Sequence, residues 1–99
     1  MEAAEAFGIE LRARRLEANL TQEQLAFEAE IQRVYVSKLE LGRAQPTLTM
    51  LLTLARALDC TAGDLVDAVE QRIANAHKKK KSNPKSRRVR ARASAKLPE

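Results

Sequence analysis

The stretch TQEQLAFEAEIQRVYVSKLELGR, residues 21–43, contains two short helical patterns that follow one another closely. Thr21 and Gln24 have the spacing of a capping box, in which a Thr hydroxyl and a Gln side chain each bond a free backbone N–H at the start of a helix. The sequence therefore predicts a first helix of this pair over residues 22–29.

A second short helix is expected over residues 33–41. Gly42 is suited to the left-handed residue that follows a helix, and Pro46 breaks any continuation. Only about three residues, 30–32, separate the two helices, so they must cross at a steep angle. This is the helix-turn-helix arrangement, in which the second helix can enter the major groove of DNA.

Apolar spacing divides these helices into an inner and an outer side. The residues expected to face inward are Leu25, Ala26, Ala29, Ile31, Val36 and Leu39. The residues left pointing outward are Gln32, Arg33, Val34, Ser37 and Lys38. Arg and Lys donate to guanine O6 and N7, Gln pairs with adenine, and a Val methyl contacts the thymine methyl. We therefore predict that the outward set contacts DNA bases.

Three further helices are predicted, over residues 3–18, 48–58 and 62–76. The first has an apolar stripe of Phe7, Leu11 and Ala18, with Ile9 and Leu16 nearby. Asn19 after it suits a left-handed cap.

The last two of these helices each begin with a threonine cap. Thr47 precedes the fourth helix, whose predicted inner face consists of Leu48, Leu51, Leu52, Ala55 and Leu58. Thr61 and Asp64 again have capping-box spacing before the fifth. With no alternating strand pattern, the sequence predicts an all-α fold, a compact bundle of five helices over residues 1–76.

Charge is distributed unevenly along the 99 residues. Residues 1–76 carry 8 basic and 12 acidic side chains, a net charge of −4, whereas residues 77–99 carry 10 basic side chains and one acid, a net charge of +9. Val89 and Leu97 are the only sizeable apolar residues after His77. We expect residues 77–99 to be a disordered basic tail, because they cannot bury enough apolar surface to offset the entropy of ordering.

Several classes of protein are not expected from this composition. A single cysteine, Cys60, permits no internal disulfide and no multi-cysteine zinc site, and we interpret it as a small buried apolar residue. The lone His77 has no ligand partners, so no metal or cofactor is predicted. No apolar run is long enough to span a membrane, and the acidic N-terminus is unlike a signal peptide. No set of catalytic residues is evident and the body is too small to enclose a small-molecule site, so we expect a cytoplasmic protein that is not an enzyme.

The stretch from Thr21 to Arg43 resembles the Cro/C1-type helix-turn-helix of phage repressors and bacterial regulators, the XRE family. The resemblance extends over about residues 7–66 and includes Phe7-Gly8, Pro46-Thr47-Leu48, Leu51-Leu52, Leu54-Ala55, Ala57-Leu58 and Asp64-Leu65. It implies a five-helix bundle of the phage-repressor type that binds operator DNA as a dimer. It also implies a nucleoid-associated protein of bacterial or phage origin.

The resemblance also implies roles for individual residues. Gln22, at the start of the second helix, and Arg43, just after the third, would contact DNA phosphates. Arg15 and Glu40 match a pair that in some relatives forms a partly buried ion pair, although a surface pair of little effect is the alternative. Glu30 stands where the family usually has Gly or another small residue, at a turn position that is often left-handed.

Other assignments rest on the residues themselves and leave alternatives open. Tyr35 either packs over the edge of its helix or donates its hydroxyl to a phosphate. Val66, Val69 and Ile73 either cap the core or form a dimer contact, and we favour the dimer contact. For the basic tail we favour a nonspecific phosphate clamp over a merely solubilising segment.

We therefore predict a sequence-specific, dimeric regulator of transcription that binds double-stranded DNA, more in the manner of a repressor than of an activator. One alternative is an antitoxin-type interaction protein that binds a protein partner and represses its own operon. Another is a nonspecific nucleoid protein that acts mainly through its tail.

Overall fold

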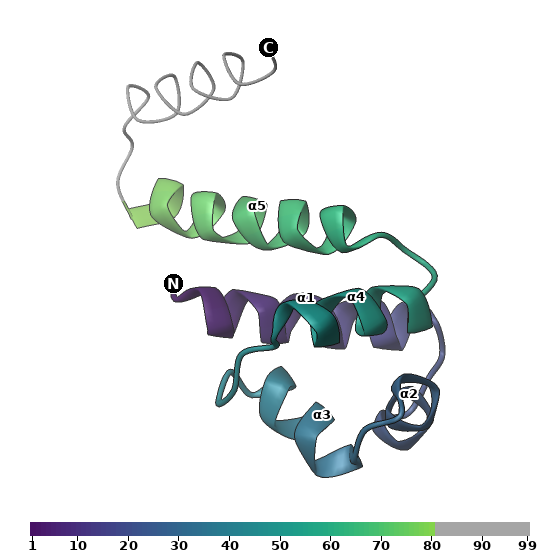
Figure 1. The fold of residues 1–99 in the computed structure, drawn as a ribbon. Helices are drawn as coiled ribbons and strands as arrows, with labels where there is room; N and C mark the ends of the chain where they lie inside the picture. Colours follow the sequence, from purple (N-terminus) through teal and green to yellow (C-terminus); the bar gives the residue numbers. More distant parts are fainter. Residues whose placement is uncertain (81–99) are drawn as a thin grey trace.

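Five helices form the fold of residues 1–80, the part of the chain that this computed structural model describes (Figure 1). Their bounds are α1, Ala3–Glu17; α2, Gln22–Ala29; α3, Arg33–Glu40; α4, Leu48–Ala57; and α5, Ala62–Lys80. The described residues contain no strand, so the predicted all-α fold is confirmed.

The core draws on every helix. Each of the five helices contributes one fully buried leucine, and these are Leu11, Leu25, Leu39, Leu54 and Leu65. Helix α1 packs against both α3 and α5, while α4 packs against α2 and α5. The pair α2 and α3 lies at one end of the bundle, α5 lies at the opposite end, and α1 and α4 lie between them (Figure 1).

Four helices end in the same way, with one left-handed residue that turns the chain. These residues are Asn19, Glu30, Gly42 and Asp59, with φ values of 61°, 59°, 74° and 60°. After α3, for example, Gly42 N–H donates to the Leu39 carbonyl and Arg43 N–H to the Lys38 carbonyl, which is the Schellman motif. The predicted cap at Asn19 is confirmed, and Glu30 adopts the left-handed conformation although it is not glycine.

Predicted boundaries differ from the observed ones at the C-terminal ends. Helices α1, α3 and α4 each end one residue earlier than predicted, because Ala18, Leu41 and Leu58 are caps with ψ near 0°. Helix α5 instead continues to Lys80, four residues beyond its predicted end at 76, since lysine is a good helix former and its charge is favourable at a helix C-terminus. The first residues of the predicted tail are therefore helical, and the rest of the tail lies outside the described residues.

The predicted inner face of α4 is only partly correct. Ala55 is buried, but Leu48 is 72% and Leu52 50% exposed, and Leu54 is fully buried in their place. On α1, Phe7 and Leu11 are buried as predicted, whereas Ile9, Leu16 and Ala18 are exposed. Both helices carry apolar residues on more than one side, so periodicity alone could not identify the side that packs.

Candidate nucleic-acid interface

Helix α2 is held in place by the capping box that the sequence predicts. Thr21 Oγ1 accepts from Gln24 N–H at 3.0 Å, and Thr21 N–H donates to Gln24 Oε1 at 2.8 Å. The inward-facing residues of α2, which are Leu25, Ala26 and Ala29, are all buried, as predicted. The turn that follows has its left-handed residue at position 30, and α3 then begins at Arg33.

One side of helix α3 packs on the core and the opposite side is open to solvent. Val36 and Leu39 are fully buried and hold it on the core. The opposite side is the α3 outer face, which consists of Gln32, Arg33, Val34, Ser37 and Lys38. Four of these residues are exposed and Ser37 is half-buried. The structure therefore places Arg33, Val34, Ser37 and Lys38 on the outer side of α3, with Gln32 exposed at its N-cap.

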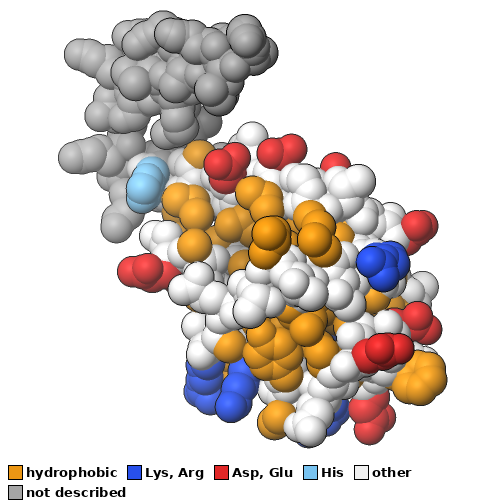
Figure 2. Space-filling view, in the orientation of Figure 1, with side chains coloured by type: hydrophobic (Ala, Val, Ile, Leu, Met, Phe, Trp, Pro, Cys, Tyr) orange, Lys and Arg blue, Asp and Glu red, His pale blue; other side chains and the backbone are white. Residues whose placement is uncertain are grey.

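The α3 outer face combines hydrogen-bonding groups with a methyl surface. Residues 33, 34, 37 and 38 are spaced so that they project from adjacent turns of the same side of a helix. The Gln32 side chain makes no capping hydrogen bond, so its amide groups remain available. Basic side chains gather at the edge of the molecule beside α3 and the loop that follows it (Figure 2). Arg43, the predicted phosphate contact in that loop, is exposed.

A buried ion pair ties α1 to α3. Arg15 Nε donates to Glu40 Oε2 at 2.6 Å and Arg15 Nη2 to Glu40 Oε1 at 3.0 Å, with side chains only 9% and 3% exposed. Arg15 Nη1 also donates to the Leu20 carbonyl at 2.9 Å. The hydrogen bonds with Glu40 outweigh burial and raise the pKa of the Arg15 guanidinium above its ordinary value. The partly buried pair that the resemblance implies is therefore present, and the surface alternative is wrong.

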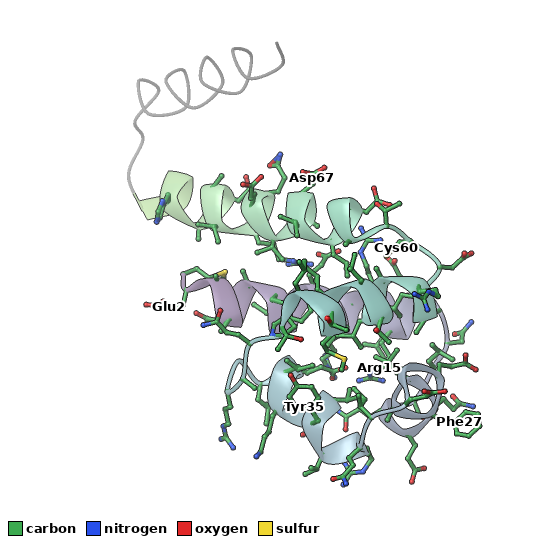
Figure 3. All side chains as sticks on the ribbon, viewed as in Figure 1. Glu2, Arg15, Phe27, Tyr35, Cys60 and Asp67 are labelled. Carbon is green, nitrogen blue, oxygen red and sulfur yellow. The ribbon has the colours of Figure 1, made fainter. Side chains whose placement is uncertain are left out.

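Gln22 lies between this ion pair and the α3 outer face. Gln22 Nε2 donates to Glu40 Oε1 at 3.0 Å, and Gln22 Oε1 accepts from Arg33 Nη1 at 3.3 Å. Figure 3 shows Arg15 between the end of α1 and the α2–α3 pair. The resemblance implies a phosphate contact for Gln22, but its contacts with Glu40 and Arg33 could not be predicted, because only the fold brings these three residues together. One N–H of the Gln22 amide is still free for a phosphate.

Tyr35 is half-buried and packs against the core. Figure 3 shows its position on α3. This supports the packing alternative, while its contact with a phosphate stays a prediction. Cys60 also packs against the core, and burial raises the pKa of its thiol.

A second ionic cluster joins α1 to α5. Glu10 accepts from Arg14 Nε at 2.6 Å and from Arg72 Nε at 2.8 Å. Burial alone would raise the pKa of Glu10, but the hydrogen bonds from the two arginines outweigh it and hold the pKa below its ordinary value. This cluster anchors the middle of α5 to α1.

The predicted dimer residues have different environments. Val66 is 41% exposed, Val69 packs against the core, and Ile73 is half-buried. Leu48 and Leu52, which the sequence analysis placed inside, are exposed together with Val66, and we call these three the apolar α4–α5 face. Figure 2 shows hydrophobic side chains gathered over this part of the molecule.

The described helices include none that is long and apolar enough to cross a membrane.

The arrangement of α2 and α3, in which a capped helix is followed after a short turn by a helix with an exposed outer face, defines a helix-turn-helix protein. The helix-turn-helix family matches residues 11–65, more than half of the chain. The chain belongs to this family, the Cro/C1-type class of DNA-binding regulators of transcription, which are not enzymes.

Three known proteins are similar to the chain, two in sequence and one in fold. The control protein C.BamHI from Bacillus amyloliquefaciens is 36% identical over 75 residues, which cover 75% of this chain and 90% of that protein. The crystal structure of the restriction-modification controller protein C.AhdI from Aeromonas hydrophila is similar with a TM-score of 0.61 and 39% identity, over 63% of this chain and 94% of that one. The controller C.Esp1396I, solved as a tetramer on its natural 35 base-pair operator, has a TM-score of 0.68 over 75% of this chain and 97% of that one, and at 22% identity it shows a shared fold.

Proposed function

We propose that this chain is a sequence-specific repressor that acts as a dimer on an inverted repeat. The α3 of each protomer would lie in the major groove of one half-site, with half-site centres about 10–10.5 bp apart. The observation that carries the proposal is the α3 outer face, where five side chains suited to base edges project from a helix fixed by Val36 and Leu39. The 39% identity to a restriction-modification controller protein supports control of such a gene system by this chain.

We favour repression over activation, because a protein that occupies its operator blocks other proteins from the same stretch of DNA. The predicted basic tail, which lies mostly outside the described residues, would add phosphate affinity without base preference.

Dimer formation is supported by the apolar α4–α5 face. Leu48, Leu52 and Val66 expose side chains that water solvates poorly, and they lie on a pair of helices separate from the α3 outer face. A twofold axis through such a face makes each residue contribute twice. The two α3 helices would then point toward the same side of a DNA duplex.

Replacing Arg33 or Lys38 with alanine should weaken binding to the preferred duplex by about 1–3 kcal/mol and relax the preference at one base pair in each half-site. The preferred sequence is obtained by selection from random duplexes, and affinities are measured by fluorescence anisotropy. Selection should also reveal an inverted repeat.

Arg14→Ala serves as a matched control, because it removes an equal charge that is already paired with Glu10 on α1. It should leave the base preference unchanged. If Arg33→Ala and Lys38→Ala bind with the same preference as the unchanged protein, the α3 outer face does not read the sequence.

Replacing Leu52 with glutamate should raise the dissociation constant of the dimer by about 100-fold or more, since each interface would then bury two unpaired carboxylates. Sedimentation equilibrium measures this constant directly. Leu16→Glu is the control, because Leu16 is also 50% exposed but lies on α1. A dimer that tolerates Leu52→Glu and is dissociated by Leu16→Glu would place the interface elsewhere.

A further inference from the structure

Four polar side chains from three helices form a continuous hydrogen-bonded network that ends on the α3 outer face. We call it the polar network, and its members in order are Arg15, Glu40, Gln22 and Arg33. The side chains of the first two are buried and joined by two hydrogen bonds, Gln22 is half-buried, and Arg33 is exposed. A buried anchor is thus connected to a side chain at the surface.

The chemistry of the network fixes the orientation of the Gln22 amide. An ionised Glu40 carboxylate only accepts hydrogen bonds, and the Arg33 guanidinium only donates them. The amide between them must therefore direct its NH₂ toward Glu40 and its oxygen toward Arg33. Glu40 is itself held by two hydrogen bonds from Arg15, so the oxygen offered to Arg33 has a defined position.

Arg33 has reason to need such an acceptor. It is the first residue of α3, where the positive end of the helix dipole repels a cation. An exposed arginine also loses considerable rotamer freedom when it is fixed against a base. The guanidinium of Arg33 has five N–H groups, of which one donates to the Gln22 oxygen. The other N–H groups are sufficient for a bidentate contact with guanine O6 and N7.

We propose that Glu40 and Gln22 are positioning residues for base recognition by Arg33. The preference at the base pair that Arg33 contacts then depends on two residues that touch no base. This inference rests on the proposed function, in which the α3 outer face reads the sequence.

The test uses the full chain and compares two duplexes, the selected operator and the same operator changed only at the base pair where Arg33→Ala relaxes the preference. The quantity measured is the ratio of the two affinities, which does not depend on the folded fraction of a preparation. Gln22→Met should lower this ratio about fivefold, because methionine has the length of glutamine but offers no oxygen. Gln71→Met, at an exposed glutamine of α5, should leave the ratio unchanged.

Glu40→Gln should lower the ratio to a similar degree. The amide introduced at position 40 can donate to the Gln22 oxygen, which then turns away from Arg33 and leaves that side chain without its acceptor. Combining Glu40→Gln with Gln22→Glu restores an acceptor toward Arg33, now a carboxylate on α2. This double variant should recover the ratio although the weakened pairing with Arg15 keeps its melting temperature low. A purely structural role for Glu40 predicts no such separation of preference from stability.

Two other results would be decisive. If Gln22→Met weakens both duplexes equally, Gln22 contributes only a phosphate contact and the positioning role is wrong. In the Arg33→Ala background, Gln22→Met should leave the ratio unchanged, and a further fall there would also overturn the inference. If Arg33→Ala changes no base preference while Lys38→Ala does, the α3 outer face still reads the sequence and only the positioning role is wrong. If neither variant changes the preference, the proposed function fails as well.

Discussion

Replacing Arg15 with methionine should lower the free energy of unfolding by about 3–5 kcal/mol. The change leaves the Glu40 carboxylate, only 3% exposed, without the two hydrogen bonds that compensate its burial. It also removes the donor to the Leu20 carbonyl between α1 and α2. Denaturation with urea at a fixed protein concentration, which keeps any dimer contribution constant, measures the difference.

The adjacent arginine provides the control. Arg14→Met should cost at most about 1 kcal/mol, because Arg14 is 28% exposed and Glu10 keeps its second partner, Arg72. The double variant Arg15→Met/Glu40→Met should be more stable than Arg15→Met, since no unpaired charge stays buried. Equal losses for Arg14→Met and Arg15→Met would show that burial of the Arg15–Glu40 pair has no energetic importance.

Replacing Gly8 with alanine should destabilise the protein by about 3 kcal/mol, although alanine is the better helix former. A Cβ at this position would lie 2.5 Å from the Leu39 carbonyl oxygen and 2.6 Å from that of Glu40. Both contacts are with backbone, so α1 and α3 would have to separate. Thermal unfolding followed by circular dichroism measures the loss, and binding to the selected operator should weaken as α3 shifts.

Gly63→Ala is the matched control on α5. A Cβ there meets only the Thr61 hydroxyl at 3.6 Å, an ordinary contact. This substitution should stabilise the protein by up to about 1 kcal/mol, as expected for a helical glycine without close neighbours. A stabilising effect of Gly8→Ala would contradict the close approach of α1 and α3.

The sequence was sufficient where signals are local. Thr21 and Gln24 predict the start of α2 because the capping box involves only residues three apart, and Asn19 and Gly42 predict helix ends for the same reason. The α3 outer face was also predictable, since a short helix with Val36 and Leu39 inside has only one free side. These features position the candidate interface, which is why most of its residues could be named in advance.

Features that depend on the assembled fold could not be predicted in this way. Leu48 and Leu52 have the spacing of an inner face, yet Leu54 packs inside, because α4 is apolar on more than one side and its neighbours decide. The Gln22 contacts join residues 11 and 18 positions apart. One of the two hydrogen bonds that compensate the burial of Glu10 comes from Arg72, which lies 62 residues away in the chain.

The separation of α3 into anchored and outward residues affects how operator preference can diverge among proteins of this fold. Val34, Ser37 and Lys38 make no hydrogen bond through their side chains to the rest of the described protein. Under the proposed function, exchanging them would change the base preference of the helix with little effect on the bundle. Position 33 differs, because its side chain shares the amide of Gln22 with Glu40. If Arg33 is positioned as proposed, a new preference at the base pair that residue 33 contacts requires substitutions at positions 22 and 33 together. We therefore expect these two positions to vary as a pair among related proteins.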